Sequence, residues 1–208
     1  MAKPLPTPVR NHLTGLRILL LFTVVCGLLY PLVITGISQV AFSSQANGSL
    51  VKSNGKVVGS SLIGQNFTIT SKDGKTVSPD PKYFQSRPSA AGANGYDPTA
   101  SAGTNLGTNS AVLVTDYTAL KKAIAAFDGV QQSQVPPDAI TSSGSGLDPD
   151  ISPQYADIQV DRVAKARDLP VGEVQALVKK YTQDRTLGFL GEPRVDVLNL
   201  NIALNKLG

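Results

Sequence analysis

The feature that most constrains this chain is an uncharged apolar stretch over residues 18–40, ILLLFTVVCGLLYPLVITGISQV. No charged residue occurs between Arg17 and Lys52. At about 1.5 Å per residue, about 20 helical residues cross the roughly 30 Å hydrocarbon core of a bilayer. A buried helix of a soluble protein rarely runs this far without a polar face. The stretch therefore predicts a transmembrane helix over residues 18–40.

Small and helix-breaking residues interrupt this stretch at Gly27, Pro31 and Gly36. Such residues weaken a helix in water but are tolerated in a membrane, especially where a second helix packs closely against them. We therefore expect Gly27, Pro31 and Gly36 to face a partner helix.

A cleavable secretory signal also combines a basic start with an apolar centre, but its apolar region is usually shorter than this one. A passable small-x-small cleavage pattern, Ser44 to Ala46, comes only after the apolar stretch has ended. Val25 stands before Cys26, where a lipoprotein signal needs a small residue. These features favour a retained anchor.

The charges around the stretch predict its orientation. Lys3, Arg10 and Arg17 precede it, whereas the first acidic residue is Asp73. Because basic flanks remain in the cytoplasm, we expect a cytoplasmic flank at residues 1–17 and an extracytoplasmic domain at residues 41–208. The expected location is the bacterial cytoplasmic (inner) membrane, crossed once with the N-terminus inside.

The composition of the outer part excludes several classes of function. The chain has 19 Lys+Arg and 15 Asp+Glu. With the basic flank set aside, the rest is nearly neutral, so nothing indicates a nucleic-acid partner. The sole histidine, His12, precedes the apolar stretch and the sole cysteine, Cys26, lies inside it. We expect neither a conventional Ser-His-Asp triad nor a metal site in the outer domain, and no catalytic residue.

The pattern of the outer part predicts a mixed α+β domain. Asn54-Gly55 between two short apolar runs is typical of a β-hairpin, and residues 189–195 look extended. Apolar periodicity and capping residues predict helices over 113–127, 153–166, 170–182 and 196–207. Between them, residues 69–109 read as a long loop, in which Tyr83, Phe84 and Tyr96 indicate packing against the domain.

Short blocks in a fixed order give the chain a family resemblance. They are residues 30–32 (YPL), 45–50 (QANGSL), 59–67 (GSSLIGQNF), 83–84 (YF), 87–90 (RPSA), 96–98 (YDP), 103–106 (GTNL), 135–136 (VP), 145–148 (SGLD), 151–153 (ISP), 162–167 (RVAKAR) and 199–207. Together they resemble the KdpC subunits of bacterial Kdp potassium-transporting ATPases. The segment of residues 69–82 is longer than the corresponding segment of that family pattern. Whether this segment contacts a partner is therefore left open.

The resemblance implies an accessory, non-catalytic subunit of an ATP-driven potassium importer. Its partners would be a channel-like potassium-binding subunit, a P-type ATPase subunit and a small single-span subunit. The family is described as a catalytic chaperone that raises the ATP affinity of the ATPase subunit. ATP would then be a ligand shared with that subunit, with no tightly bound cofactor, and Gln159 is the position carried over for it. The charge bias places Gln159 outside, however, whereas ATP is inside the cell.

Three further interpretations stay open for the outer domain. It could be a binding or assembly domain unrelated to ATP, an anchored solute-binding or signalling domain, or an anchored hydrolase. Within the expected helix over 153–166, Gln159, Arg162 and Lys165 are spaced by three residues and share a face. We expect that face to be solvated or to dock on another subunit, with Arg162 and Lys165 as the partner-facing residues.

Overall fold

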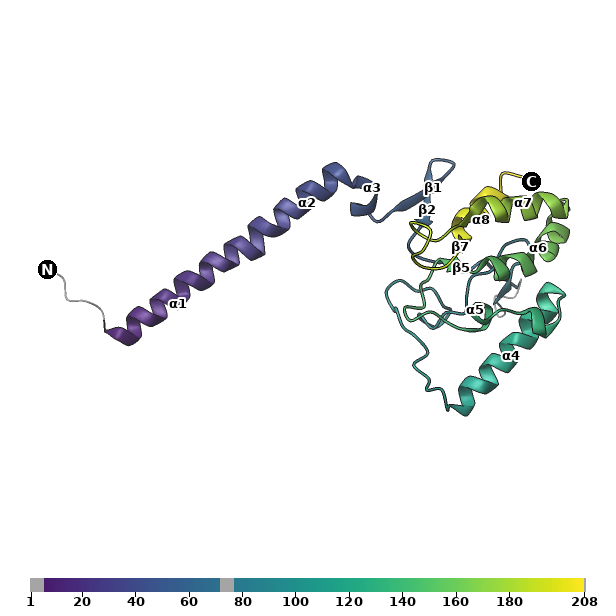
Figure 1. The fold of residues 1–208 in the computed structure, drawn as a ribbon, viewed down its shortest axis with the longest axis horizontal. Coiled ribbons are helices and arrows are strands. Elements are labelled where there is room, and N and C mark those ends of the chain that lie inside the picture. The colour runs from purple at the N-terminus through teal and green to yellow at the C-terminus, as the bar shows by residue number, and fades with distance from the viewer. Residues whose placement is uncertain (1–5, 72–76, 208) are drawn as a thin grey trace. The chain divides into compact units, whose positions relative to one another are not determined.

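The computed structural model describes residues 6–71 and 77–207, and it divides into two compact units between Ser49 and Leu50. The first unit contains one continuous helix, Thr7–Ala41 (Figure 1). None of the residues in the most apolar part of this helix is buried within the chain. It is the one helix among the described residues that is long and apolar enough to cross a membrane. The predicted apolar helix is confirmed. Lys3, one of the three flanking basic residues, lies outside the described residues.

A wide turn in the middle of this helix accommodates its proline. The helix consists of α1 (Thr7–Val24), a π-helical turn η1 (Val25–Leu29) and α2 (Tyr30–Ala41). Pro31 has no N–H, and its ring would clash with the carbonyl group four residues earlier, which is that of Gly27. In the wide turn, the N–H of Tyr30 bonds to the carbonyl of Val25, five residues earlier. This geometry lets the helix continue through Pro31. A short helix α3 (Ser43–Ala46) follows.

Within the residues that the structure describes, the second unit contains three small antiparallel sheets. They are β1 (Leu50–Ser53) with β2 (Lys56–Ser60), β3 (Thr68–Thr70) with β4 (Val77–Pro79), and a three-stranded sheet of β5 (Asp150–Ile151), β7 (Arg194–Asp196) and β6 (Thr182–Gln183) in that order. Asn54 and Gly55 form the first turn with φ angles of 49° and 77°, which confirms the predicted hairpin. The extended segment predicted at 189–195 is shorter than expected, because residues 186–190 form a tight turn. Residues 72–76 of the long 69–82 segment lie outside the described residues.

The helices of the second unit are α4 (Ala111–Asp128), the 3-10 turn η2 (Gln132–Gln134), α5 (Pro137–Ile140), α6 (Pro153–Arg167), α7 (Val171–Tyr181) and α8 (Val197–Leu204). The side chains of Ser110, Ser152 and Asp196 accept backbone hydrogen bonds at the starts of α4, α6 and α8. Gly129 ends α4 in the left-handed conformation. The four helices predicted from the sequence, and the α+β class, are confirmed.

The core of the second unit lies among α6, α7, α8 and β7, while α4 lies at its edge (Figure 1). Its largest fully buried apolar side chains are those of Phe84, Val163, Val174, Val195, Val197, Leu200 and Leu204. Phe84 comes from the long loop, and Tyr96 from the same loop is also buried. The prediction that this loop packs against the domain is therefore confirmed.

The second half of the long loop is held against residues 141–149 at Gly146. The backbone N–H of Ala102 donates to the carbonyl of Ser145 at 3.0 Å, and the Ser89 hydroxyl donates to the carbonyl of Gly146 at 2.6 Å. Gly146 has a φ angle of +67°, and a Cβ atom built on it would lie 2.6 Å from the carbonyl oxygen of Ala102. A glycine is required here for both reasons.

Candidate functional site

The polar centre of the domain surrounds a stretch of backbone, residues 81–85, that pairs with no strand in the part of the chain that the structure describes. Side chains of α6 and α8 make most of its hydrogen bonds instead, and the N–H groups of Lys82 and Tyr83 bond to Asp80. We call these side chains the backbone clamp: Gln159, Arg162 and Arg167 from α6, and Asn201 from α8. Because buried backbone N–H and C=O groups must be paired, the clamp allows a loop without strand partners to enter the core.

Two buried amides of the clamp each bind one residue of the loop in both directions. Gln159 is 0% exposed; its Oε1 accepts the N–H of Gln85 at 2.7 Å, and its Nε2 donates to the carbonyl of Gln85 at 3.2 Å. Asn201 does the same with the N–H and the carbonyl of Phe84, both at 2.9 Å. Each amide thus replaces the neighbouring strand that the loop lacks.

Arg162 binds the carbonyl groups of the same stretch. Its Nη1 donates to Pro81 at 2.7 Å and to Tyr83 at 2.9 Å, and its Nη2 donates to Gln159 Oε1 at 2.7 Å. Its Nε forms an ion pair with Asp128 at 2.7 Å. The guanidinium also lies 4.4 Å from the ring centre of Phe127.

The ion pair between Arg162 and Asp128 is buried, with side-chain exposures of 6% and 2%. Burial raises the pKa of the Asp128 carboxyl, and the hydrogen bond and charge of Arg162 act in the opposite direction. An arginine keeps its charge under all ordinary conditions. Asp128 therefore supplies the counter-charge that allows this cation to lie in the interior.

The burial of two side chains on α6 corrects the prediction that Gln159, Arg162 and Lys165 form an exposed face. Gln159 and Arg162 are buried, so the prediction of a solvated or docking face is wrong for both side chains. The physical reason is the clamp, since loop carbonyls and Asp128 satisfy an arginine that would otherwise be too costly to bury. Lys165 is exposed, as expected. In this arrangement the Gln159 amide presents no surface to a nucleotide.

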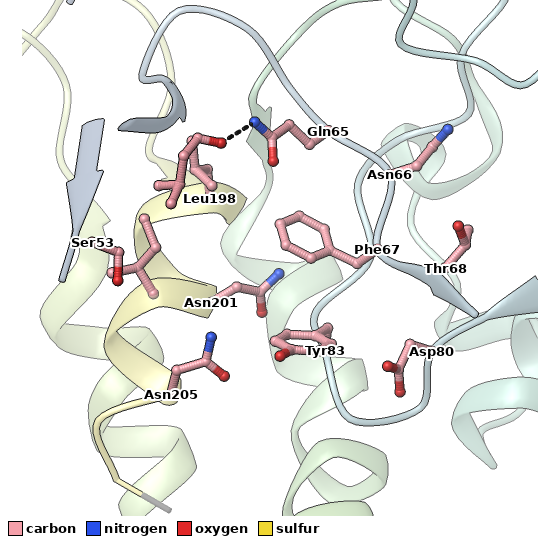
Figure 2. Close-up of a pocket in the computed structure, with 12 residues that line it drawn as sticks. Ser53, Gln65, Asn66, Phe67, Thr68, Asp80, Tyr83, Leu198, Asn201 and Asn205 are labelled. Carbon is pink, nitrogen blue, oxygen red and sulfur yellow. Dashed lines mark hydrogen bonds between the residues drawn. The ribbon is translucent and has the colours of Figure 1, made fainter. Parts of the chain in front are cut away.

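A surface hollow of about 310 Å³ lies beside the clamp, between the β1–β2 hairpin, β3 and α8 (Figure 2). The ring centres of Phe67 and Tyr83 are 5.5 Å apart in it, and Asn201 from α8 and Asn205, which follows α8, reach toward them. Arg167 stacks 4.7 Å from the centre of the Tyr83 ring and donates to Asn205. Asn201 bonds to the backbone of Phe84, and Asn205 bonds to Arg167, so both amides already have partners. We therefore interpret the hollow as the outer edge of the clamp.

A second charged group links the loops around β5. Arg87 pairs with Asp148 at 2.9 Å, and Arg194 pairs with Asp150 at 3.2 Å. Burial, together with the charges of Asp196 and Asp148, raises the pKa of Asp150 to about 6. Within residues 6–71 and 77–207, no three His, Cys, Asp or Glu side chains are arranged to hold a metal ion.

The candidate residues of the apolar helix have open space beside them. Apart from neighbouring residues and the backbone of the same helix turn, no atom of this chain lies within 4 Å of a Cβ built on Gly36, and the nearest to one built on Gly27 is Thr23 Cγ2 at 4.0 Å. The chain itself therefore leaves room for a neighbouring helix along both glycines.

The sequence interpretation missed Asp128, Arg167 and Asn201. Asn201 had a detectable signal, because it is one of two amides in the otherwise apolar helix α8, VLNLNIAL, and a buried amide needs partners. Asp128 had none, since its partner Arg162 is far away in the sequence.

Comparison with known proteins finds relatives that match nearly the whole chain. Residues 12–206 match the family model described as KdpC, the c chain of the K+-transporting ATPase. The chain is 52% identical to the potassium-transporting ATPase KdpC subunit of Streptomyces avermitilis, over 93% of this chain and 92% of that protein. It is 49% identical to the subunit of the same name in Gemmatimonas aurantiaca (88% of this chain, 86% of that protein). It is 51% identical to the subunit of the same name in Caulobacter vibrioides, over 89% of this chain and 87% of that protein.

Proposed function

The chain belongs to the KdpC family of potassium-transporting ATPase subunits, and from this premise we propose that it supports assembly of the transporter from outside the membrane without touching ATP. It is a non-catalytic membrane subunit of the Kdp complex, with one apolar helix. The proposed partners are a channel-like potassium-binding subunit, a P-type ATPase subunit and a small single-span subunit. An effect on the ATP affinity of the ATPase subunit would then arise through assembly.

The burial of Gln159 carries the part of the proposal that concerns ATP. Its side chain is 0% exposed, and its amide makes hydrogen bonds with Gln85 and Arg162. A nucleotide could reach this amide only after residues 81–85 had left the core. Such an opening would break the hydrogen bonds of the clamp, so a structural role for Gln159 is the simpler account.

A Gln159→Ala variant tests this part of the proposal. We expect the domain to lose about 1–3 kcal/mol of stability, because both backbone groups of Gln85 become unpaired in the interior. We expect the KM for ATP of the complex that still assembles to remain at the wild-type value. Thermal unfolding of the isolated subunit and ATPase assays on the purified complex measure the two effects separately.

The matched control is Gln175→Ala, which removes an exposed amide from α7 and should change neither stability nor KM. A raised KM for ATP in a Gln159→Ala complex of normal stability and composition would contradict the proposal. It would support the chaperone mechanism instead.

The proposed orientation rests on the charge bias of the flank, in which Arg10 and Arg17 precede the apolar stretch without any acidic residue. A reporter enzyme that works only outside the cytoplasmic membrane, fused after the last residue, should be active. A reporter that works only in the cytoplasm should be inactive at the same position. The reverse pair of results would refute both the orientation and the separation of Gln159 from ATP.

We also propose that Gly27, Pro31 and Gly36 lie along a helix–helix contact within the complex. Gly36→Leu and Gly27→Leu should insert normally, because little of this chain occupies the space beside either glycine. Both should reduce co-purification of the other subunits, since added bulk separates two closely packed helices. The measurement is the yield of each partner after gentle solubilisation with a tagged copy of this chain.

Ile37→Leu serves as the control, since it changes the shape of an exposed side chain of the same helix without adding bulk beside either glycine. It should leave the yield of partners unchanged. Full recovery of partners with both glycine variants would mean that the glycines face lipid. On α6, exposed Lys165 remains a candidate for a contact outside the membrane, whereas Arg162 is assigned to the clamp.

A further inference from the structure

The tip of the β6–β7 hairpin, residues 187–190, exposes three large apolar side chains in succession. Leu187 is 79% exposed, Phe189 is 67% exposed and Leu190 is 49% exposed. Single exposed apolar side chains are common on protein surfaces, but a group at the end of a projecting turn usually has a binding role.

The backbone of the tip holds these side chains in a fixed arrangement. Thr186 and Leu190 exchange both of their N–H···O bonds at 2.9 Å, and the N–H of Phe189 donates to the carbonyl of Thr186 at 3.3 Å. Leu187 and Gly188 have φ angles of +56° and +81°. A leucine at positive φ is strained. The turn therefore presents Leu187 outward at a conformational cost.

The tip is too small for a protein interface of ordinary size. A stable protein interface buries roughly 800 Å² on each partner, which is far more than four residues at a convex turn can supply. A lipid surface sets no such minimum, because each apolar side chain that enters the headgroup region contributes independently. At the base of the tip, Arg185 forms an ion pair with Glu192, which lowers the cost of bringing these charges toward the interface.

A lipid surface is also always within reach of this domain. The apolar helix ends at Ala41 and β1 begins at Leu50, so residues 42–49 alone connect them. Eight extended residues would span roughly 28 Å at about 3.5 Å each, and this linker is shorter because it contains the helix α3. A tethered domain meets the surface at a high effective concentration, so that weak contacts become significant.

From these observations we propose that residues 187–190 insert their apolar side chains into the headgroup region of the membrane that holds the chain's own helix. The tip would form a second, shallow contact that fixes how the domain lies on the membrane. This inference holds for a domain on either side of the membrane, and it does not depend on the proposed assembly role.

The test uses the full chain reconstituted in vesicles of phosphatidylcholine and phosphatidylglycerol, some with brominated acyl chains. An environment-sensitive fluorophore is attached at Thr186→Cys in a Cys26→Ala background, which leaves the three apolar side chains in place. We expect a blue-shifted emission and a loss of fluorescence when brominated lipid is present. The triple variant Leu187→Ser, Phe189→Ser, Leu190→Ser should show neither effect, with an unchanged melting temperature.

The matched control is Val112→Ser with Val114→Ser on α4, which removes two apolar side chains of similar exposure, 58% and 62%. It should keep both fluorescence effects. Absence of quenching in the wild-type tip, or quenching that persists in the triple variant, would overturn the proposal. Shielding that appears only when the other subunits are added, without quenching by brominated lipid, would overturn it in favour of a protein partner.

Discussion

Replacing Arg162 with methionine should destabilise the outer domain by about 3–5 kcal/mol, the usual cost of removing one partner of a buried ion pair. The variant would leave the carboxylate of Asp128 in the interior without its counter-charge. It would also leave the carbonyl of Pro81 without the donor that binds it, and the carbonyl of Tyr83 with the bond from Gln85 Nε2 alone. Because a domain is typically stable by only about 5–15 kcal/mol, this loss is a large part of the total free energy of unfolding, and the melting temperature should fall clearly.

The pH dependence of this loss identifies its cause. Without Arg162, the buried Asp128 would bind a proton more tightly in the folded state than in the unfolded state. The folded variant should therefore recover stability as the pH falls toward the raised pKa of Asp128, and lose it as the pH rises. Urea unfolding of the full-length subunit in detergent, at several pH values, measures both the loss and its recovery.

Lys165→Met is the control for Arg162→Met, because it removes an exposed cation three residues further along the same helix. Its unfolding free energy should stay within about 0.5 kcal/mol of wild type. A double variant that also carries Asp128→Asn should regain part of the stability lost in Arg162→Met. Equal unfolding midpoints for Arg162→Met and wild type would show that the clamp contributes little.

Gly146→Ala should destabilise the domain by about 2–5 kcal/mol, combining backbone strain with a steric clash. The residue has a φ angle of +67°, and its Cβ would lie 2.6 Å from the carbonyl oxygen of Ala102 and 2.9 Å from the backbone nitrogen of Ala91. These are backbone atoms, so relief requires the loop around residues 91–102 to move. Thermal unfolding measures the loss, and proteolysis within that loop should become faster.

Two other glycines separate the contributions to this effect. Gly188 has a positive φ angle of +81°, but a Cβ built on it would meet open space. Gly188→Ala should therefore lower the stability of the domain by about 1 kcal/mol, from backbone strain alone. Gly144→Ala has neither feature and should be nearly neutral. If Gly146→Ala proved no more harmful than Gly188→Ala, the loop contact at Ala102 would be easily rearranged.

Local signals in the sequence were sufficient for the regular elements. Ser152 followed by a proline predicts the start of α6, Gly129 predicts the end of α4, and Asn54-Gly55 predicts the first hairpin, because each acts on its immediate neighbours. The apolar helix was equally clear from its length and lack of charge. Such signals depend on a few consecutive residues, so they hold whatever tertiary contacts the rest of the chain makes.

The clamp could not be predicted in the same way. Arg162 was expected at a surface because a buried cation is costly, and that cost is offset only by Asp128 and by carbonyls some 80 residues earlier in the sequence. A pattern of spacing within α6 shows which residues share a side, but it does not show what covers that side. The direction in which Gln159 and Arg162 point is therefore a property of the tertiary structure.

The clamp also has a consequence for the order in which the domain can be completed. Residues 81–85 leave the ribosome long before Asn201, which lies 117 positions after its partner Phe84. Until α8 has been synthesised, the N–H and carbonyl of Phe84 must stay hydrated and its ring cannot remain in the core. Contacts this distant in sequence make folding slow. A chain that still lacks α8 thus cannot complete the core around Phe84, and the last helix to be synthesised is the one that closes the domain.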